Sequence, residues 1–198
     1  MRTRFILAFL CLSSVAAGAP QDADARRAAY LEGDRAMVAK DWPAAEKIFE
    51  KLWVEGPTYD VALSLGQAEF RQNKYREAAE HIEYAITNYP PREKTDTLQR
   101  AKQFLNVATK QIGTLHITVE KGGAEVRIDG EPIGTSPLRA NTYVDVGSHV
   151  VEARLVDHAP TRQEVTVAAG SEQNVELKFT GPVLLTGIET AGSEPKAG

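Results

Sequence analysis

A short stretch in the second half of the chain, residues 124–138, alternates apolar and polar side chains and then turns back on itself. Val126 and Ile128 alternate with charged neighbours, which is the period-2 pattern of a half-buried strand. Asp129-Gly130 supplies two residues that tolerate positive φ, as a two-residue hairpin turn requires. Pro132 cannot donate a hydrogen bond to a neighbouring strand, so the returning strand is expected at a sheet edge.

Similar short alternating segments, separated by glycine-rich turns, continue along the chain. A second turn at residues 134–137 is expected to precede a new strand that begins at Leu138. Further strands are predicted at 114–119, 143–146, 149–155, 164–167 and 174–179. Six or seven short strands of this kind predict a small all-β sandwich over residues 113–179, followed by a flexible tail over 180–198.

The order of strand, Asp-Gly turn, Gly-Thr-Ser-Pro turn and strand resembles the PEGA family of small bacterial β-sandwich domains. The resemblance extends from Gly113 to Phe179. Lys121-Gly122-Gly123-Ala124 stands where the family has its name-giving tetrapeptide, so only the Gly-Ala end is kept. The resemblance implies a module without catalytic activity.

The first half of the chain carries an internal repeat with a period of 33 residues. Five positions hold the same register in both copies: Gly33 and Gly66, Trp42 and Tyr75, Ala45 and Ala78, Phe49 and Ile82, and Pro57 and Pro90. Ala45 and Phe49 lie on one helix face at spacing i, i+4. The pattern predicts two helical hairpins, residues 26–58 and 59–91, with Ala45 and Ala78 buried where helices cross.

The spacing Gly-x11-Ala-x3-(Phe/Ile)-x7-Pro resembles the tetratricopeptide repeat (TPR). In that family the first helix of each repeat lines a concave groove, so the resemblance implies a peptide-binding groove here. The matching positions are Arg27, Tyr30, Asp34, Met37, Asp60, Leu63, Gln67, Phe70 and Arg71. Their mixed chemistry suits an extended or helical peptide. The alternative for Tyr30, Met37, Leu63 and Phe70 is that they pack against neighbouring helices.

Residues 92–112 predict a further helix, with an apolar stripe that ends in Leu105, Ala108 and Ile112. The segment starts like a third repeat but does not complete a hairpin, so we expect a capping helix that closes a helical domain over 26–112. Two repeats and a cap are fewer than solenoids usually need. We therefore expect the end of this helix to pack on the sandwich near Leu115 and Ile117, with Gly113 as the only available hinge.

The N-terminus has the layout of a secretory signal peptide over residues 1–17: two arginines, an apolar run and then small residues. Cleavage is expected near residues 17–19. The alternative is an uncleaved membrane anchor, although the apolar run is shorter than the roughly 20 residues that a spanning helix needs. The only cysteine, Cys11, lies in this run, so the mature protein is expected to contain no cysteine and no membrane span.

The sequence shows no catalytic, metal or cofactor pattern. The histidines, His81, His116, His149 and His158, are scattered without zinc-ligand spacing. No glycine-rich phosphate loop and no nucleophile elbow occur. With 23 basic and 27 acidic side chains, the chain also has no basic footprint for nucleic acid. We expect no enzymatic activity, no cofactor and no nucleic-acid partner.

The sequence as a whole predicts an α+β protein of two domains, exported and periplasmic. We expect a non-enzymatic adaptor or scaffold whose partner is another protein of the bacterial cell envelope or a second copy of the chain. The alternative is a carbohydrate or peptidoglycan binder that acts through the sandwich. Such sites usually present exposed aromatic rings, and residues 113–179 offer only Tyr143 and Phe179, of which Phe179 is expected in the core.

Overall fold

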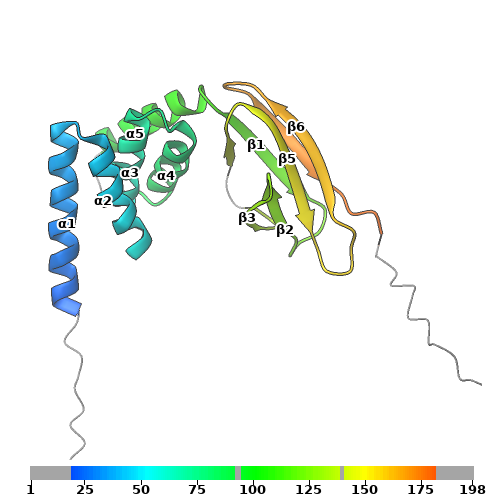
Figure 1. Cartoon of the computed structure of the whole chain (residues 1–198), viewed down its shortest axis with the longest axis horizontal. Coiled ribbons are helices and arrows are strands. Elements are labelled where there is room, and N and C mark those ends of the chain that lie inside the picture. Colours follow the sequence, from blue (N-terminus) through cyan, green and yellow to red (C-terminus); the bar gives the residue numbers. More distant parts are fainter. Residues whose placement is uncertain (1–18, 92–94, 139–140, 182–198) are drawn as a thin grey trace, which may run out of the picture.

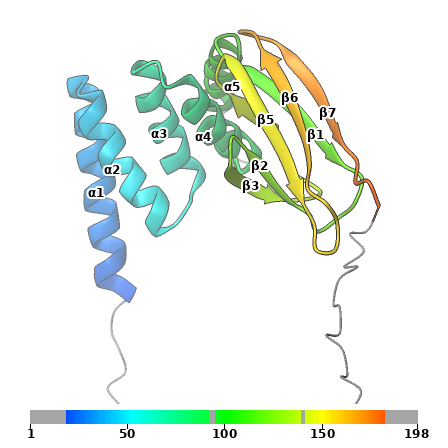
Figure 2. The ribbon, with the colours of Figure 1, turned by 45° about the vertical axis from the view of Figure 1, so that its right-hand side comes forward.

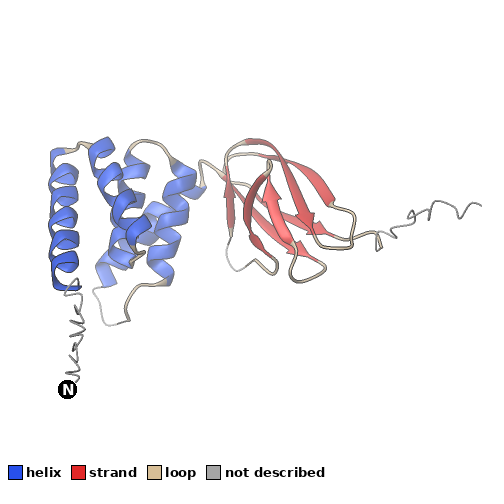
Figure 3. Cartoon of the chain, turned by 60° about the horizontal axis from the view of Figure 1, so that its bottom comes forward, coloured by secondary structure: helices blue, strands red, loops and turns tan. Residues whose placement is uncertain are grey.

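The computed structural model describes residues 19–91, 95–138 and 141–181. Five helices in a row are followed by seven strands in two sheets (Figure 3). The predicted fold class, α+β in two parts, is therefore confirmed. We call the helices the helical half and residues 113–181 the β half. The predicted signal peptide, and the predicted tail from residue 182 onward, lie outside the described residues.

The helical half consists of two helical hairpins and a fifth helix. The helices are α1 (Ala19–Ala39), α2 (Trp42–Glu55), α3 (Tyr59–Arg71), α4 (Tyr75–Thr87) and α5 (Thr95–Thr109). Helix α1 begins seven residues before the predicted start of the first hairpin at residue 26. Each helix packs on the next along the chain, and α3 also contacts α1 and α5. The β half lies at the α4–α5 end of the row, away from α1 (Figures 1 and 2).

The two hairpins repeat one close contact at the 33-residue interval. A Cβ atom on Gly33 would lie 2.6 Å from Cζ of Phe49, and a Cβ atom on Gly66 would lie 2.6 Å from Cγ1 of Ile82. Glycine is therefore needed at both positions to let the large side chain of the second helix reach the first helix. Ala45 and its equivalent Ala78 are fully buried beside these contacts, as the sequence predicts.

The β half is a sandwich of two sheets. The strands are β1 (Gly113–Val119), β2 (Glu125–Ile128), β3 (Glu131–Thr135), β4 (Thr142–Val144), β5 (Gly147–Arg154), β6 (Thr161–Val167) and β7 (Glu172–Leu177). One sheet has the order β4-β1-β7 and the other the order β3-β2-β5-β6. Alternate residues of both sheets fill one core, whose fully buried members include Leu115, Val126, Val151 and Val175.

The predicted hairpin forms between β2 and β3. Asp129 (φ 53°) and Gly130 (φ 88°) both have positive φ, as a type I′ turn requires, and β3, which contains Pro132, is an edge strand. The prediction that a strand restarts at Leu138 is wrong. The next strand begins at Thr142, and Leu138 packs against the sandwich core instead.

The two halves meet through Tyr143, which is 5% exposed. Its ring packs with Ala79 of α4, with Ala108 in the last turn of α5, and with Ile112 just after that helix. The predicted contact between this end and the sandwich therefore exists, but it is made by Tyr143. Leu115 and Ile117, near which the contact was predicted, belong to the sandwich core instead: Leu115 is fully buried in it and Ile117 packs against it.

Two polar contacts flank Tyr143 and also join the halves. Asn141 donates from Nδ2 to Oε1 of Glu83 at 2.9 Å, and Nε of Arg76 lies 3.5 Å from Oδ2 of Asp145. The expected hinge is also packed, because a Cβ atom on Gly113 would lie 1.8 Å from Cγ1 of Val167. The junction is thus built from side chains of both halves and does not depend on the connecting residue alone.

Candidate functional site

The first helix of each hairpin contributes to one shared face, formed by α1 and α3. The hydroxyl groups of Tyr30 on α1 and Ser64 on α3 are hydrogen-bonded at 3.2 Å. Asp34 on α1 and Asp60 on α3 are half-buried neighbours. Burial, and then the negative charge of Asp60, raise the pKa of Asp34 above its ordinary value. The face therefore holds two carboxyl groups whose solvation is already reduced, above an anchoring hydrogen bond.

The polar members of the predicted groove are accessible. Arg27 is exposed, and Asp34, Asp60 and Gln67 are half-buried. All four lie on α1 or α3, so the structure brings together residues from the two copies of the repeat. Side chains of this kind can accept and donate hydrogen bonds to a peptide laid across both helices.

The apolar members of the predicted groove pack between helices. Leu63 is only 8% exposed. The ring of Phe70 meets the rings of Tyr75 and Phe104 edge-on, with centroids 5.6 and 5.1 Å apart. The prediction that Leu63 and Phe70 line a groove is therefore corrected, because α3 lies between other helices and these side chains fill the space between them.

Three further groove residues have partners inside the helical half. Met37 and Tyr30 pack against the core of the first hairpin. The guanidinium carbon of Arg71 lies 5.8 Å from the ring centroids of both Trp42 and Phe104. This is cation–π distance, so Arg71 bridges α2 and α5 with its charged group while remaining exposed.

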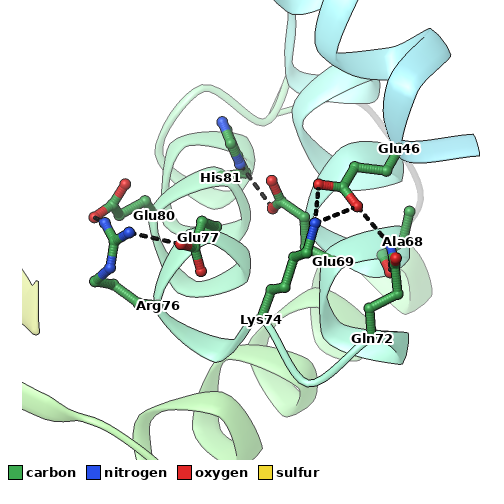
Figure 4. A network of polar contacts seen from close by, with 9 residues as sticks. All are labelled: Glu46, Ala68, Glu69, Gln72, Lys74, Arg76, Glu77, Glu80 and His81. Carbon is green, nitrogen blue, oxygen red and sulfur yellow. Dashed lines mark hydrogen bonds and ion pairs between the residues drawn. The ribbon is translucent and has the colours of Figure 1, made fainter. Parts of the chain in front are cut away.

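The sequence analysis missed a buried ionisable pair in the second hairpin. Glu69 on α3 is 4% exposed, and its Oε2 lies 2.8 Å from Nδ1 of His81 on α4 (Figure 4). Burial raises the pKa of Glu69 above its ordinary value, against the opposing effect of His81. The edge of the Trp53 ring system packs on His81, with centroids 5.0 Å apart.

The repeat itself carried the signal for this pair. Shifted back by 33 residues, Glu69 and His81 correspond to Ala36 and Ile48, which both pack against the core of the first hairpin. Two apolar residues that pack on one core in the first copy thus correspond to an acid and a base in the second copy. Such a paired replacement at equivalent positions indicates contact across a hairpin, and comparing the copies position by position would have found it.

A second polar cluster ties the first hairpin to the turn of the second. Both carboxylate oxygens of Glu46 on α2 accept from Nζ of Lys74, at 2.6 and 2.8 Å, and Oε2 also accepts from Gln72 at 2.6 Å (Figure 4). The cluster is built on α2 and the α3–α4 turn, and it shares no residue with the predicted groove. It fixes the two hairpins relative to each other.

The two aromatic side chains that the β half offers for carbohydrate binding are both buried. Tyr143 is buried at the junction and Phe179 in the sandwich core, so neither presents an exposed ring. Burial and the charge of Glu83 raise the pKa of Tyr143 to about 12. Across residues 19–91, 95–138 and 141–181, no group of three His, Cys, Asp or Glu side chains is arranged to hold a metal ion.

Comparison with known families places one domain in this chain. Residues 112–181 match the family model of the PEGA domain. PEGA domains are typically extracellular or periplasmic. A search of curated proteins found no match. Among the helices that the structure describes, none has the length and apolar character to cross a membrane.

Proposed function

We propose that this protein is a non-enzymatic adaptor of the bacterial cell envelope, and that it binds a segment of another envelope protein on the shared face of α1 and α3. The PEGA domain supports an extracytoplasmic location, and the basic and apolar N-terminal segment supports export. The repeated glycine contacts at Gly33 and Gly66 support a TPR-like helical half, whose first helices form a binding surface.

The observation that carries the proposal is the set of accessible polar groups that α1 and α3 share. Asp34 comes from the first copy of the repeat and Asp60 and Gln67 from the second, and the Tyr30–Ser64 hydrogen bond joins the same two helices. A peptide that crosses both helices would be recognised by several such groups at once. The groups are held on rigid helices, which lowers the entropy cost of binding.

The experiment that tests the proposal is in vivo crosslinking of the full chain, followed by purification and identification of the crosslinked envelope protein. The double variant Asp34→Asn/Asp60→Asn should lose most of the crosslink, because it removes the two neighbouring carboxylates of the face. Glu50→Gln is the matched control, since Glu50 is exposed on α2, outside this face. Equal crosslinking by the two variants would contradict the proposal.

Two further measurements test location and the competing function. Cell fractionation and N-terminal sequencing of the purified protein should find a periplasmic chain that begins near residues 18–20. A cytoplasmic protein that retains Met1 would overturn the envelope location. Co-sedimentation with insoluble peptidoglycan tests carbohydrate binding, and strong binding that survives the Asp34→Asn/Asp60→Asn change would favour a cell-wall binder over an adaptor.

A further inference from the structure

A cleft of about 700 Å³ opens between the two halves, away from the shared face of α1 and α3. Helix α4 contributes one wall through Arg76 and Glu80. The β2–β3 hairpin contributes Ile133, and the segment around β4 contributes Asp145. This volume lies within the range of about 300–1,000 Å³ that is usual for small-ligand sites.

The charged wall of the cleft has more carboxylates than cations among the described residues. The Arg76 guanidinium pairs with two acids of this wall, Glu80 at 3.3 Å and Asp145 at 3.5 Å, and also with Glu77, which lies outside the cleft lining, at 2.6 Å. The side chain of Asp145 is 70% exposed. Burial raises the pKa of Glu80 above its ordinary value, even though Arg76 acts in the opposite direction. A second cation at this wall would therefore be stabilised.

The histidine of the cleft does not supply that cation to the wall. Nδ1 of His149 lies 2.7 Å from Oδ2 of Asp129, and Nε2 lies 2.8 Å from the carbonyl oxygen of Asp145. Both partners can only accept, so Nδ1 donates to the turn between β2 and β3 and Nε2 donates to the turn between β4 and β5. The positive charge of His149 is thus compensated by Asp129 and leaves the carboxylates near Arg76 in excess.

The β2–β3 hairpin, which also contributes Asp129 and Glu131 to the lining, presents an apolar patch to the cleft. Ile133 on the edge strand β3 is 38% exposed, Pro132 beside it is exposed, and Leu138 is half-buried. A ligand with both a cationic group and an apolar group can therefore contact the two walls together. An anion would meet the carboxylates of the charged wall and be repelled.

We propose that this interdomain cleft binds a lysine or arginine side chain of an extended protein segment, with a neighbouring apolar residue of that segment against Ile133 and Leu138. The cation is attracted by the carboxylates of Glu80 and Asp145, which line the cleft and share Arg76 as their partner. This site shares no residue with the face of α1 and α3, so it is a second docking site. Because its walls come from different halves, binding in the cleft also depends on the junction around Tyr143, which holds the two walls in place.

The test is a selection of a random 12-residue peptide library on the full-length protein, with counter-selection on the Glu80→Gln/Asp145→Asn variant. Peptides that depend on the cleft should carry Lys or Arg next to an apolar residue. A synthetic peptide from this set, measured by fluorescence anisotropy, should bind the variant about tenfold more weakly or worse. Replacing its basic residue with glutamine should weaken binding to the wild type by a similar factor.

Two control variants separate binding in the cleft from binding elsewhere on the chain. Glu164→Gln/Glu176→Gln removes two exposed carboxylates from β6 and β7, outside the cleft, and should leave binding unchanged. Ile133→Ser tests the apolar wall without changing charge and should also weaken binding, with an unchanged circular dichroism spectrum.

Each contrary result overturns the proposal. A selection that yields no cleft-dependent peptide, or that yields acidic peptides, excludes a cation site. Loss of binding in Asp34→Asn/Asp60→Asn, with full binding in Glu80→Gln/Asp145→Asn, would assign the peptides to the face of α1 and α3 and remove the cleft as a site. This result would overturn the proposed cleft site and leave the proposed adaptor function, which rests on the face of α1 and α3, unaffected.

Discussion

In the helical half, Asp34, Glu69 and Glu80 have raised pKa values, and burial is the largest cause in each case. In the β half, Glu125, Asp129 and Glu152 have lowered pKa values. The same type of group therefore responds in opposite directions in two regions of one chain. The cause lies in the local geometry of helices and strands.

On the strands, an arginine two residues away on the same face stabilises the charged form. Glu125 accepts from Arg127, and Glu152 accepts from Arg154. For Asp129, burial acts to raise the pKa, but the hydrogen bonds from His149 and from the backbone of Val150 outweigh it. In the helical half, close helix packing desolvates carboxyl groups, and their partners compensate only in part.

This difference has consequences for stability because a pKa shift is a difference in proton affinity between the folded and unfolded states. A raised carboxyl pKa means that the folded state holds the proton more tightly, so stability falls as pH rises above the ordinary value. A lowered carboxyl pKa means that stability is present above the ordinary value and is lost as pH falls. Through these carboxyl groups, the helical half should gain stability as pH falls toward the ordinary carboxyl pKa, and the β half should lose stability as pH falls below it.

The junction at Tyr143 couples the unfolding of the two halves, so their different pH dependence cannot be seen in the wild type. Removing the Tyr143 ring should therefore have the largest effect on stability. Tyr143→Ala removes the ring that packs on Ala79, Ala108 and Ile112, and should destabilise the chain by about 3 kcal/mol. Tryptophan fluorescence reports only on the helical half, because both tryptophans, Trp42 and Trp53, lie there. Circular dichroism reports on the whole chain.

In urea, the two signals of Tyr143→Ala should give separate midpoints, whereas those of the wild type should coincide. At acidic pH the fluorescence midpoint should move to higher urea relative to the circular dichroism midpoint. Val156→Ala is the matched control, since Val156 is 82% exposed in the same half. Coincident midpoints in Tyr143→Ala would show that the halves are coupled by something other than this side chain.

The next largest loss of stability is expected from overpacking the helical half, which tests whether its helices are as closely packed as the structure shows. Ala78→Leu should cost about 1–3 kcal/mol, because Ala78 is fully buried and its carbonyl oxygen would lie only 3.1 Å from a Cβ atom on Gly66. The melting temperature is the measurement, and Ala28→Leu on the exposed side of α1 is the control. An unchanged melting temperature for Ala78→Leu would mean that the repeat register does not describe the packing.

Local spacing was enough to predict the contacts that the chain makes over short distances. The 33-residue register predicted the buried Ala45 and Ala78, and Asp129-Gly130 predicted the β2–β3 turn. The sequence predicted that the end of the helical half meets the sandwich, but it could not identify the residue, since no local pattern indicates that Tyr143 of a three-residue strand meets Ala79 of α4. It also left open whether Leu63 lines the groove or packs between helices, because the choice depends on which neighbours cover each face of α3.

A smaller effect sharpens the comparison within the helical half. Glu69→Gln removes the group whose raised pKa makes wild-type stability fall as pH rises above its ordinary value of 4.5. The variant should therefore show a flatter dependence of the fluorescence-detected urea midpoint on pH in that window. Glu50→Gln, an exposed change on α2, should keep the wild-type slope. A wild-type slope in Glu69→Gln would assign the pH dependence to other groups.

The smallest effect concerns the histidine that holds a turn of the β half. Burial acts to lower the pKa of His149, but Asp129 and the carbonyl oxygen of Asp145 outweigh it and raise the pKa above the ordinary value of 6.5. For a raised histidine pKa, the added stability is complete below 6.5 and is lost as pH rises through the folded value.

His149→Gln should therefore be less stable than the wild type below pH 6.5. Above pH 6.5 the stability of the wild type should decline with rising pH, and that of the variant should not. The urea midpoint from circular dichroism, measured in the Tyr143→Ala background, isolates this decline from the helical half. His158→Gln is the control, because Nδ1 of His158 contacts the backbone carbonyl oxygen of Val156, whereas Nδ1 of His149 contacts a carboxylate. If the urea midpoint of His149→Gln still declined above pH 6.5, a group other than His149 would cause the decline. The charged imidazole, with its hydrogen bonds to Asp129 and Asp145, would then not be what stabilises the turn between β4 and β5.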